Sequence, residues 1–336
     1  MNILYFFYFI KTTDWKRLKK HRDFVSERYG MSKWQLFWDV IGCALKYGIS
    51  FHEYYYYGFY QKTTELRAEY ASMGFMYRYQ KTMNPPDKRS MLADKNKFDK
   101  AFAEFMHRDL LNPITATVDE ITAFVEGREK VVLKRSTGGG GKNVEILKIK
   151  ENKITPQILK DEAIAKNYDI LEEFVQQHED LQKLSPNSLN TVRFITQRTK
   201  DGHVEVVGAS LRMGIYKNTD NLSSGGITCK VNIETGQLES KGYAFDITQP
   251  LCDVHPVSGI ALVGFQIPCW DAVKTLCINA ASKYDDNKSV GWDVAIKQDG
   301  PLLIEGNHDW GARVWQMPAG HGLKPILEKY LREYKS

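Results

Sequence analysis

Apolar and polar residues recur with helical spacing over the first quarter of the chain. Mixed apolar and basic residues follow Asp14 and Ser32 at that spacing, and both side chains can cap the first backbone N–H groups of a helix. The pattern stops at Asn84-Pro85-Pro86-Asp87, where two prolines interrupt a helix. We therefore predict a mainly helical N-terminal region over residues 1–88.

A run of tyrosines lies inside this helical region. Tyr54 to Tyr57, with Phe59 and Tyr60, place aromatic rings on every side of a helix. Such a segment is predicted to be wedged between other elements, with its hydroxyl groups hydrogen-bonded at a rim. The alternative is a surface on which sugar rings stack.

After residue 88 the pattern changes to a mixture of helices and strands. Helical spacing predicts helices over 97–107, 156–166 and 268–284. Apolar and β-branched runs predict strands over 130–134, 144–149, 170–175, 191–196, 204–209, 294–296 and 302–304. The two kinds of element do not alternate strictly, which favours an α+β fold over a doubly wound sheet.

Length and composition are those of a folded globular protein. The 336 residues suffice for two domains, and 43% hydrophobic with 26% charged residues is compatible with a packed core. A formal charge of +5 suits anionic small substrates and is too weak to indicate a nucleic-acid partner. The five cysteines form no CxxC pair and no zinc-binding spacing, which favours a reducing cytoplasm.

The aromatic segment at the start of the chain, Met1 to Ile10, is a candidate for membrane contact. It lacks a basic leading segment and a small-residue cleavage site, and it is too short to span a bilayer. We predict a cytoplasmic protein without a transmembrane segment. Peripheral contact of this aromatic, lysine-rich end with a membrane surface is one interpretation. The other, which we favour, is that the aromatic rings pack between helices.

A glycine-rich loop follows the predicted strand 130–134. The four residues Gly138, Gly139, Gly140 and Gly141 expose backbone N–H groups that can meet the oxygens of phosphates. Lys134, at the end of the strand, would add a positive charge there. The loop is not a P-loop, because Ser136 and Asn143 occupy positions that need Gly and Ser or Thr. It is not a dinucleotide fingerprint either, because a strand follows it. A flexible hairpin tip is the structural alternative.

The second candidate site is a hairpin of carboxylates near the end of the chain. Asp299-Gly300 is a turn signal between two apolar runs, and folding there brings Asp293 opposite Glu305. Strand alternation places Asn307 on the face of Glu305. Two carboxylates and an amide oxygen suit Mg²⁺, whose coordination water and phosphates complete. A solvated polar face is the alternative. Alanine at Asp293 or Glu305 is expected to abolish ATP turnover and leave the fold intact.

A phosphate-covering glycine hairpin followed by an Asp…Glu-x-Asn hairpin resembles the ATP-grasp superfamily. Asp94-Lys95-Asn-Lys-Phe98 is similar to the segment whose lysine contacts ATP phosphates, which implies this role for Lys95 and, second, for Lys134. Leu171 to Val175 resembles the strand whose backbone reads adenine, which implies Glu172, Glu173 and Val175. The ribose would bind Glu179 or Asp180, between which the sequence does not choose. The resemblance implies two α+β lobes, about 89–175 and 176–336, that clasp ATP and Mg²⁺.

Several segments are more narrowly similar to the sugar-transfer-associated ATP-grasp family of polysaccharide biosynthesis. They are Asn190-Thr-Val-Arg193, Leu211-Arg212, Asp220 to Gly226 and Gly291-Trp-Asp293. The resemblance implies catalytic roles for Arg193 and Arg212. It implies substrate contacts for Asn190, Asn221, Gly225, Gly226 and His308. One departure is Asn307 to Gly311, which replaces an expected proline-containing turn and leaves the local substrate contacts in doubt.

The resemblance implies a carboxylate–amine ligase that activates a carboxylate as an acyl phosphate and forms an amide. The substrate would be a sugar acid, an amino acid or a related glycan precursor. An ATP-grasp kinase acting on a hydroxyl group shares every residue named so far and stays open. A glycan-associated protein without turnover is disfavoured, because neither the lysines nor the carboxylate hairpin is damaged.

Overall fold

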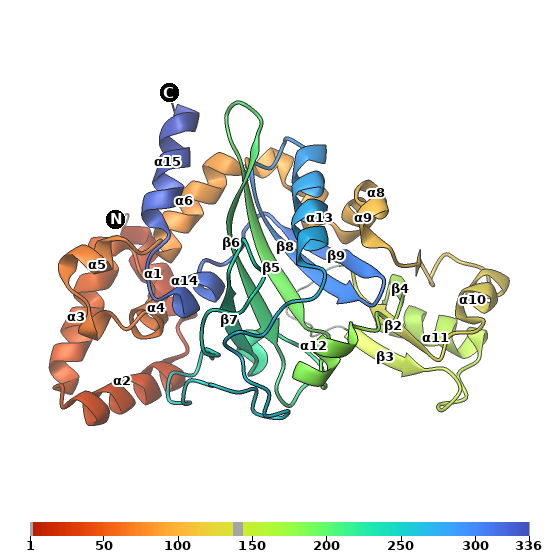
Figure 1. The fold of residues 1–336 in the computed structure, drawn as a ribbon, viewed down its shortest axis with the longest axis horizontal. Helices are drawn as coiled ribbons and strands as arrows, with labels where there is room; N and C mark the ends of the chain where they lie inside the picture. Colours follow the sequence, from red (N-terminus) through yellow and green to blue (C-terminus); the bar gives the residue numbers. More distant parts are fainter. Residues whose placement is uncertain (1–2, 137–143, 336) are drawn as a thin grey trace.

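The computed structural model describes residues 3–136 and 144–335, with side chains from residue 6 onward. Three parts lie side by side along the longest axis: a helical region, a large central sheet and a small lobe (Figure 1). The helical region consists of α1 (Ile3–Thr12), α2 (Trp15–Tyr29), α3 (Lys33–Tyr47), α4 (Phe51–Tyr56), a 3₁₀ turn (Phe59–Gln61), α5 (Thr64–Ala68) and α6 (Met73–Met83). The prediction of a helical N-terminal region is confirmed.

The predicted helix caps are present. Asp14 accepts a hydrogen bond from the backbone of Arg17, and Ser32 accepts one from the backbone of Trp34. The tyrosine run is buried as predicted, and two of its hydroxyls have side-chain partners. Tyr54 donates to Asp39 at 2.6 Å, and Tyr57 accepts from Gln316. Burial excludes the alternative of a sugar-stacking surface at Tyr54 to Tyr57.

The small lobe begins after a connecting segment of short helices. These are a 3₁₀ turn (Pro86–Lys88), α7 (Ser90–Ala93), α8 (Lys95–Ala101) and α9 (Ala103–Met106). The predicted helix 97–107 is thus wrong as one helix, because the backbone leaves the helical conformation at Phe102. The lobe itself contains β1 (Leu110–Leu111), α10 (Val118–Val125), β2 (Lys130–Lys134), β3 (Val144–Lys148), α11 (Pro156–Lys166) and β4 (Ile170–Glu173). Its strands pair antiparallel in the order β1-β4-β2-β3.

The central sheet is also antiparallel, in the order β7-β6-β5-β8-β9. Its elements are α12 (Glu179–Leu184), β5 (Thr191–Arg198), β6 (Val204–Met213), a 3₁₀ turn (Leu222–Ser224), β7 (Ile227–Val231), α13 (Trp270–Lys283), β8 (Ser289–Lys297), β9 (Gly300–Asn307), α14 (Arg313–Ala319) and α15 (Lys324–Lys335). The β8–β9 turn is Gln298-Asp299, one residue earlier than predicted. Gly300, with a φ of 135°, already pairs with Lys297.

The two faces of the central sheet differ in character. One face carries apolar residues such as Val192, Phe194 and Trp292, which pack with α13 in the largest core cluster. Because side chains alternate along a strand, the other face carries the intervening residues, among them Arg193 and Asp293. That polar face is where the candidate site lies.

The helical region and the central sheet share packed contacts. Tyr79 of α6 is buried in one cluster with Ile195 of β5 and Trp310. Asn84, at the predicted boundary, is fully buried and donates to the carbonyls of Ser289 and His308, both at 2.6 Å. The predicted domain boundary at residue 88 stays a prediction. Residues before it, such as Tyr79 and Asn84, pack against the central sheet.

His21 lies in the core of the helical region. His21 is fully buried, stacks edge-on against His52, Tyr55 and Tyr56, and lies 3.5 Å from Asp246 without a well-aligned hydrogen bond. Burial lowers the pKa of His21 to about 4, and Arg17 and Lys20 add to this effect while Asp246 opposes it. His21 is therefore neutral in the folded protein at neutral pH.

This burial predicts a stability that falls as the pH is lowered. Between pH 7 and pH 5 the unfolded chain binds a proton at His21 that the folded chain does not, so the free energy of unfolding should drop by about 1–2 kcal/mol from this residue. Urea titrations at both pH values measure the drop. His21→Phe should reduce it, whereas the same change at the exposed His203 should not. Equal drops in wild type and His21→Phe would contradict the prediction.

Candidate active site

The carboxylate hairpin forms as predicted. Asp293 on β8 lies directly opposite Glu305 on β9, and a bulge follows at once because Val294 pairs with Leu303. Asn307 shares the face of Glu305 and donates from Nδ2 to Glu305 Oε1 at 3.2 Å and to the carbonyl of Gly291 at 3.3 Å. The amide thus presents its NH₂ group to Glu305. A metal bound there would need the amide turned over, so that its oxygen faces the site.

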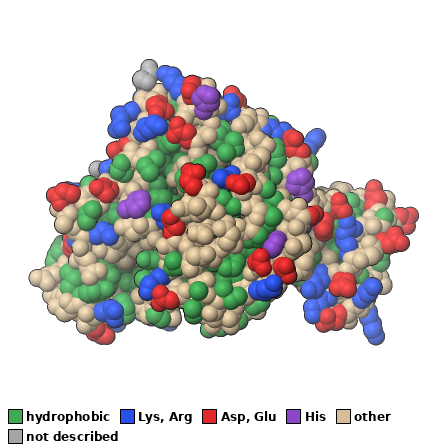
Figure 2. All heavy atoms as spheres, in the orientation of Figure 1, with side chains coloured by type: hydrophobic (Ala, Val, Ile, Leu, Met, Phe, Trp, Pro, Cys, Tyr) green, Lys and Arg blue, Asp and Glu red, His purple; other side chains and the backbone are tan. Residues whose placement is uncertain are grey.

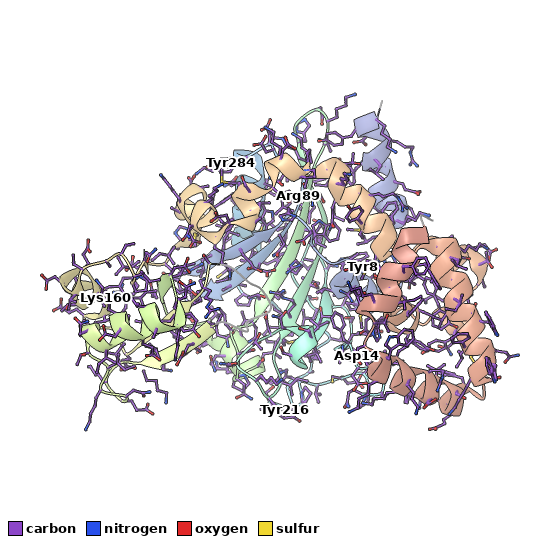
Figure 3. All side chains as sticks on the ribbon, turned by 180° about the vertical axis from the view of Figure 1, so that it is seen from behind. Tyr8, Asp14, Arg89, Lys160, Tyr216 and Tyr284 are labelled. Atoms are coloured by element: carbon purple, nitrogen blue, oxygen red, sulfur yellow. The ribbon has the colours of Figure 1, made fainter. Side chains whose placement is uncertain are left out.

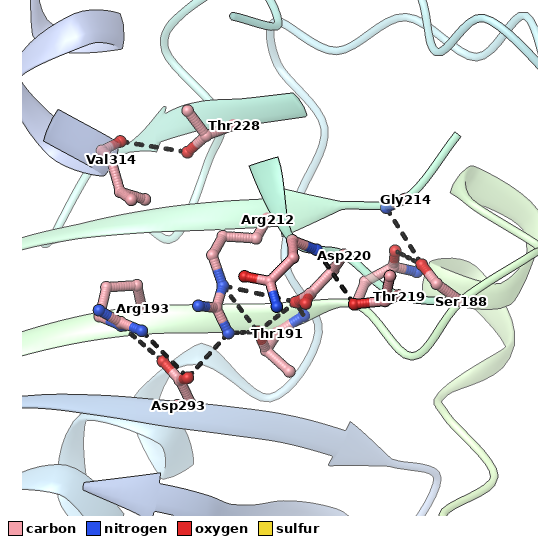
Figure 4. A network of polar contacts seen from close by, with 12 residues as sticks. Ser188, Thr191, Arg193, Arg212, Gly214, Thr219, Asp220, Thr228, Asp293 and Val314 are labelled. Carbon is pink, nitrogen blue, oxygen red and sulfur yellow. Dashed lines mark hydrogen bonds and ion pairs between the residues drawn. The ribbon is translucent and has the colours of Figure 1, made fainter. Parts of the chain in front are cut away.

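Both predicted arginines contact Asp293. Strand pairing places Arg193 of β5 opposite Asp293, and its Nε and Nη2 donate to the two carboxylate oxygens at 2.5 and 3.1 Å. Arg212 of β6 donates from Nη2 to Asp293 Oδ2 at 2.8 Å, and its Nε and Nη2 also contact Thr191. Figure 4 shows Asp293 between the two guanidinium groups. One carboxylate is therefore neutralised by two buried cations.

Asp220 completes this network from the loop after β6. It accepts hydrogen bonds from the backbone N–H and the hydroxyl of Thr191, and its carboxylate lies 3.4 Å from Arg212 Nε. The carboxylates of Asp220 and Asp293 and both arginine side chains of the network are buried. The sequence analysis placed Asp220 in a motif and gave it no role. The structure places it behind Arg212, where it positions the guanidinium group.

The two carboxylates of the hairpin differ in charge. Burial would raise the pKa of Asp293, but Arg193 and Arg212 lower it to about 2, so Asp293 is ionised. Burial and the charge of Asp293 raise the pKa of Glu305. The charges of Arg193 and Arg212 oppose this rise. A divalent cation would relieve the repulsion between the two carboxylates. The donor set Asp293, Glu305 and Asn307 therefore fits Mg²⁺, with Asp293 sharing its oxygens with the arginines.

The two predicted phosphate lysines lie close together, Lys134 in the small lobe and Lys95 in the connecting segment before it. Lys134 ends β2 and its Nζ lies 2.6 Å from Glu172 Oε2, while Lys95 begins α8 and donates to the carbonyl of Arg135 at 3.1 Å. Burial lowers the pKa of Lys95, and the charge of Lys134 lowers it further while Glu305 opposes both. Both ammonium groups thus lie within electrostatic reach of each other, and Lys95 within that of Glu305.

The predicted glycine loop connects two paired strands. Lys134 of β2 pairs with Val144 of β3, which confirms the strand–loop–strand arrangement. Gly138 to Gly141 lie outside the described residues. The start of the loop is anchored, because the backbone N–H and hydroxyl of Ser136 donate to the carboxylate of Asp169 at 2.6 and 2.5 Å.

Arg108 is a site residue that the sequence analysis missed. Its Nε donates to Glu172 at 3.1 Å, and its two terminal nitrogens donate to the carbonyls of Leu303 and Ile304 at 2.5 and 3.3 Å. Arg108 therefore joins β4 of the small lobe to β9 of the central sheet beside Glu305. Burial would raise the pKa of Glu172, but Lys134 and Arg108 lower it. The side chain of Glu172 is occupied by these cations, and the predicted backbone role is unaffected.

The predicted adenine and ribose residues lie around the segment that links the lobes. Val175 is buried against Ala295 and Leu302. β4 ends at Glu173, two residues before the predicted strand end, and the Glu173 N–H donates to the carbonyl of Asp109. A hollow of about 500 Å³ lies beside this segment and is lined by Gln176, Gln177, Glu179, Gln182, Lys183, Lys297, Gln298 and Asp299.

Of the two ribose candidates, Glu179 lines this hollow. Asp180 does not line it and lies 3.7 Å from His178 Nδ1 and 3.6 Å from Lys183 Nζ. The hollow favours Glu179, and the choice between Glu179 and Asp180 stays open. The contact with ribose itself stays a prediction.

The predicted substrate residues divide into two groups. Asn190 is fully enclosed, and its amide NH₂ donates to Gln177 and to the carbonyls of Leu181 and Ser185. These bonds give Asn190 a structural role, and its contact with substrate stays a prediction. His308 is different. Its Nδ1 is buried without a hydrogen-bond partner among the described residues, and burial lowers its pKa.

Backbone geometry explains why glycines occupy the loop after β6. Gly225 has a φ of 99°, and a Cβ on Gly226 would lie 2.7 Å from the carbonyl oxygen of Asp220. Asn221 closes the turn, since its carbonyl accepts from the N–H groups of Ser224 and Gly226. The turn shapes the backbone that carries Asp220. Substrate contact by Asn221, Gly225 and Gly226 stays a prediction.

A small antiparallel lobe beside a larger antiparallel sheet that carries the carboxylate hairpin is the arrangement of the ATP-grasp fold. The chain belongs to the sugar-transfer associated ATP-grasp family, whose model matches residues 75–331. The predicted fold class and family are thereby confirmed. No protein with a curated description matches the chain.

Solved ATP-grasp structures share the fold at low identity. The ATP-grasp ligase PsnB complexed with minimal precursor is 13% identical, with 77% of this chain and 68% of that chain covered and a TM-score of 0.45. The D-alanine-D-alanine ligase from Coxiella burnetii is 10% identical, with 73% and 59% covered and a TM-score of 0.43. The D-cycloserine synthetase DcsG is 11% identical, with 76% and 77% covered and a TM-score of 0.41. These likenesses concern the fold alone.

Proposed function

We propose that this protein is an ATP- and Mg²⁺-dependent carboxylate–amine ligase. The observation that carries the proposal is that Lys95 of the connecting segment and Lys134 of the small lobe lie near Glu305 and Asp293 of the central sheet. Cations that suit phosphates and oxygens that suit a metal thus lie at one junction. Membership of an ATP-grasp family supports the same assignment. The two lobes would be about 89–175 and 176–336, behind the helical region 1–88.

In the proposed reaction a substrate carboxylate oxygen attacks the γ-phosphorus of ATP, and the bond from that phosphorus to ADP breaks. An amine then attacks the acyl carbon, forms the amide bond and expels inorganic phosphate, with its proton passing to solvent. Bound Mg²⁺ would neutralise charge on the phosphates. Catalysis of this kind is mainly positioning and charge neutralisation.

The side chains have separate tasks in this proposal. Lys95 and Lys134 bind phosphate oxygens, and for this Lys134 exchanges its contact with Glu172 for one with ATP. Asp293, Glu305 and Asn307 hold the metal. Arg193 and Arg212 fix Asp293 in place. Arg193 bonds Asp293 through Nε and Nη2, so its Nη1 is the group that can turn to the transferring phosphoryl group.

The proposed substrate is a sugar acid, an amino acid or a related precursor in polysaccharide biosynthesis. The sugar-transfer association of the family supports a glycan precursor. ATP and this small substrate are the proposed partners, and a cytoplasmic location is the matching proposal.

Hydroxylamine trapping tests the proposed intermediate. The protein is incubated with ATP, Mg²⁺, hydroxylamine and candidate sugar acids or amino acids, and hydroxamate and phosphate are measured. The ligase should form hydroxamate and inorganic phosphate in equal amounts, because hydroxylamine replaces the amine in attack on the acyl carbon. If a stable phosphorylated alcohol formed in place of the hydroxamate, the protein would be a kinase and the ligase proposal would be refuted. Reactions without carboxylate, and without Mg²⁺, are the controls.

A further inference from the structure

The net charge of the chain is concentrated at one end. Residues 1–48 contain nine lysines and arginines and four aspartates and glutamates, so their formal charge of +5 equals that of all 336 residues. The remaining residues are therefore neutral as a set. In the structure these 48 residues form α1, α2 and α3, at the end of the molecule opposite the small lobe (Figure 1).

Helix α3 has two apolar sides. Leu36, Val40 and Ala44 point inward and are buried. A second stripe at helical spacing, Trp34, Phe37, Trp38 and Leu45, points outward, with Trp34 71% and Trp38 63% exposed. An amphipathic helix packed on a core needs only the first stripe. The second one has no covering element among the described residues.

Exposed aromatic rings also lie on the neighbouring helices α1 and α2. Phe7 of α1 is 61% exposed, and Tyr8 and Trp15 are more than half exposed. A hollow of about 140 Å³ between α2 and α3 is lined by Trp15, Leu18, Lys19, Arg22, Phe37, Val40, Ile41, Phe51 and Tyr55. Figure 2 shows hydrophobic side chains gathered over α2 and α3, and Figure 3 shows Tyr8 and Asp14 from behind, on the side of the helical region next to the central sheet. We name the exposed rings of α1 to α3 the aromatic face.

Unpaired basic side chains border the aromatic face. Lys11, Lys16 and Lys19 are exposed and form no ion pair with a described acidic residue. Lys19 lines the same hollow as Phe37, so charge and rings are mixed within one surface. Exposed apolar patches of this kind mark interaction sites. Tryptophan and tyrosine with lysine and arginine are the residues that occupy the boundary between lipid acyl chains and headgroups.

We propose that the aromatic face docks on the surface of a bilayer that contains anionic lipids. The rings would enter the headgroup boundary, and Lys11, Lys16 and Lys19 would meet the lipid phosphates. No described helix is long and apolar enough to cross a membrane, so the contact is peripheral. A second copy of the chain is the poorer occupant, because a two-fold contact would set one +5 surface against another.

Docking would also hold the candidate active site near the membrane surface. The helical region is joined to the central sheet by Gln316 of α14, which hydrogen-bonds Tyr57 and both backbone groups of Ala71. Tyr56 stacks on Phe245, which follows β7, with ring centres 5.1 Å apart. The lobe that carries Asp293 would therefore be kept at a fixed distance from the lipid.

Vesicle sedimentation tests the proposal with the full chain. Two kinds of vesicle are compared, each at two salt concentrations. One is phosphatidylcholine alone, and the other contains about 30% phosphatidylglycerol, which gives a strong negative surface potential. Wild type should bind the anionic vesicles and lose binding at high salt. Each lysine near the surface contributes about 1 kcal/mol, so Lys16→Gln with Lys19→Gln should weaken binding about 20–30-fold. Trp34→Ala with Trp38→Ala should weaken it on both kinds of vesicle.

Matched variants away from the aromatic face keep the test specific. Tyr216→Ala removes an 82% exposed ring from another surface, and Lys150→Gln with Lys153→Gln removes two exposed lysines from the small lobe. These should bind vesicles like wild type. Absence of wild-type binding, or equal losses in the control variants, would overturn the proposal. Loss of a dimer in Trp34→Ala/Trp38→Ala, with no vesicle binding by wild type, would assign the face to a second copy.

Discussion

Glu305→Gln is expected to lower ATP-dependent turnover by about 10²–10³-fold, the usual cost of removing one charge-stabilising group from an active site. The substitution keeps the shape of the side chain and removes the charge that would bind the metal. The fold should be unaffected or slightly more stable, because Glu305 is a buried carboxylate beside the ionised Asp293. ADP release measured against Mg²⁺ concentration, together with urea unfolding, checks both parts.

A matched glutamate separates this effect from a general loss of charge. Glu239 pairs with Lys230 of β7 at 2.9 Å on the same sheet and makes no contact with Asp293 or Glu305. Glu239→Gln should leave turnover unchanged. If Glu305→Gln kept turnover within about threefold of wild type at saturating Mg²⁺, the metal site would lie elsewhere, since a single ligand should be worth far more.

Local signals were sufficient for the elements that carry the site. The β8–β9 hairpin and its register followed from two apolar runs around Asp299-Gly300, with the turn displaced by one residue. Helix α11, at Pro156–Lys166, has the predicted bounds, since Pro156 marks its first turn and Asn167 ends it in a left-handed conformation.

Other elements escaped prediction for different reasons. The two-residue strand β1 is too short for any periodicity and exists only because β4 lies beside it. Helix α10 did carry a signal. Thr117 and Glu120 form a capping box at its start, and this spacing could have been read from the sequence.

The contacts within the site depend on the order of the strands. Arg193 meets Asp293 because β5 lies between β6 and β8, and 100 residues separate the two side chains in the chain. Arg108 reaches Leu303 across 195 residues. No local pattern encodes either pairing. The family resemblance implied catalytic roles for the two arginines, but their direct contact with Asp293 required the fold.

Those contacts change the expected result for Asp293→Ala. The sequence alone predicted lost turnover with an intact fold. In the structure the substitution leaves the guanidinium groups of Arg193 and Arg212 buried without their shared carboxylate. Breaking a buried ion pair from one side costs about 3–5 kcal/mol, so the free energy of unfolding should fall by that amount. Urea denaturation measures it, and lost turnover in this variant is then partly lost folding.

Two further variants test whether the unpaired arginines cause the loss of stability in Asp293→Ala. Glu239→Ala breaks a more exposed pair with Lys230 and should cost at most about 1 kcal/mol. Asp293→Ala combined with Arg193→Met should recover part of the lost stability, because one of the two buried charges is removed with its partner. A cost below about 1 kcal/mol for Asp293→Ala alone would mean that water or Asp220, 3.4 Å from Arg212, compensates the arginines. Asp293 would then serve as a proposed metal ligand, and its two ion pairs would not be needed for the stability of the fold.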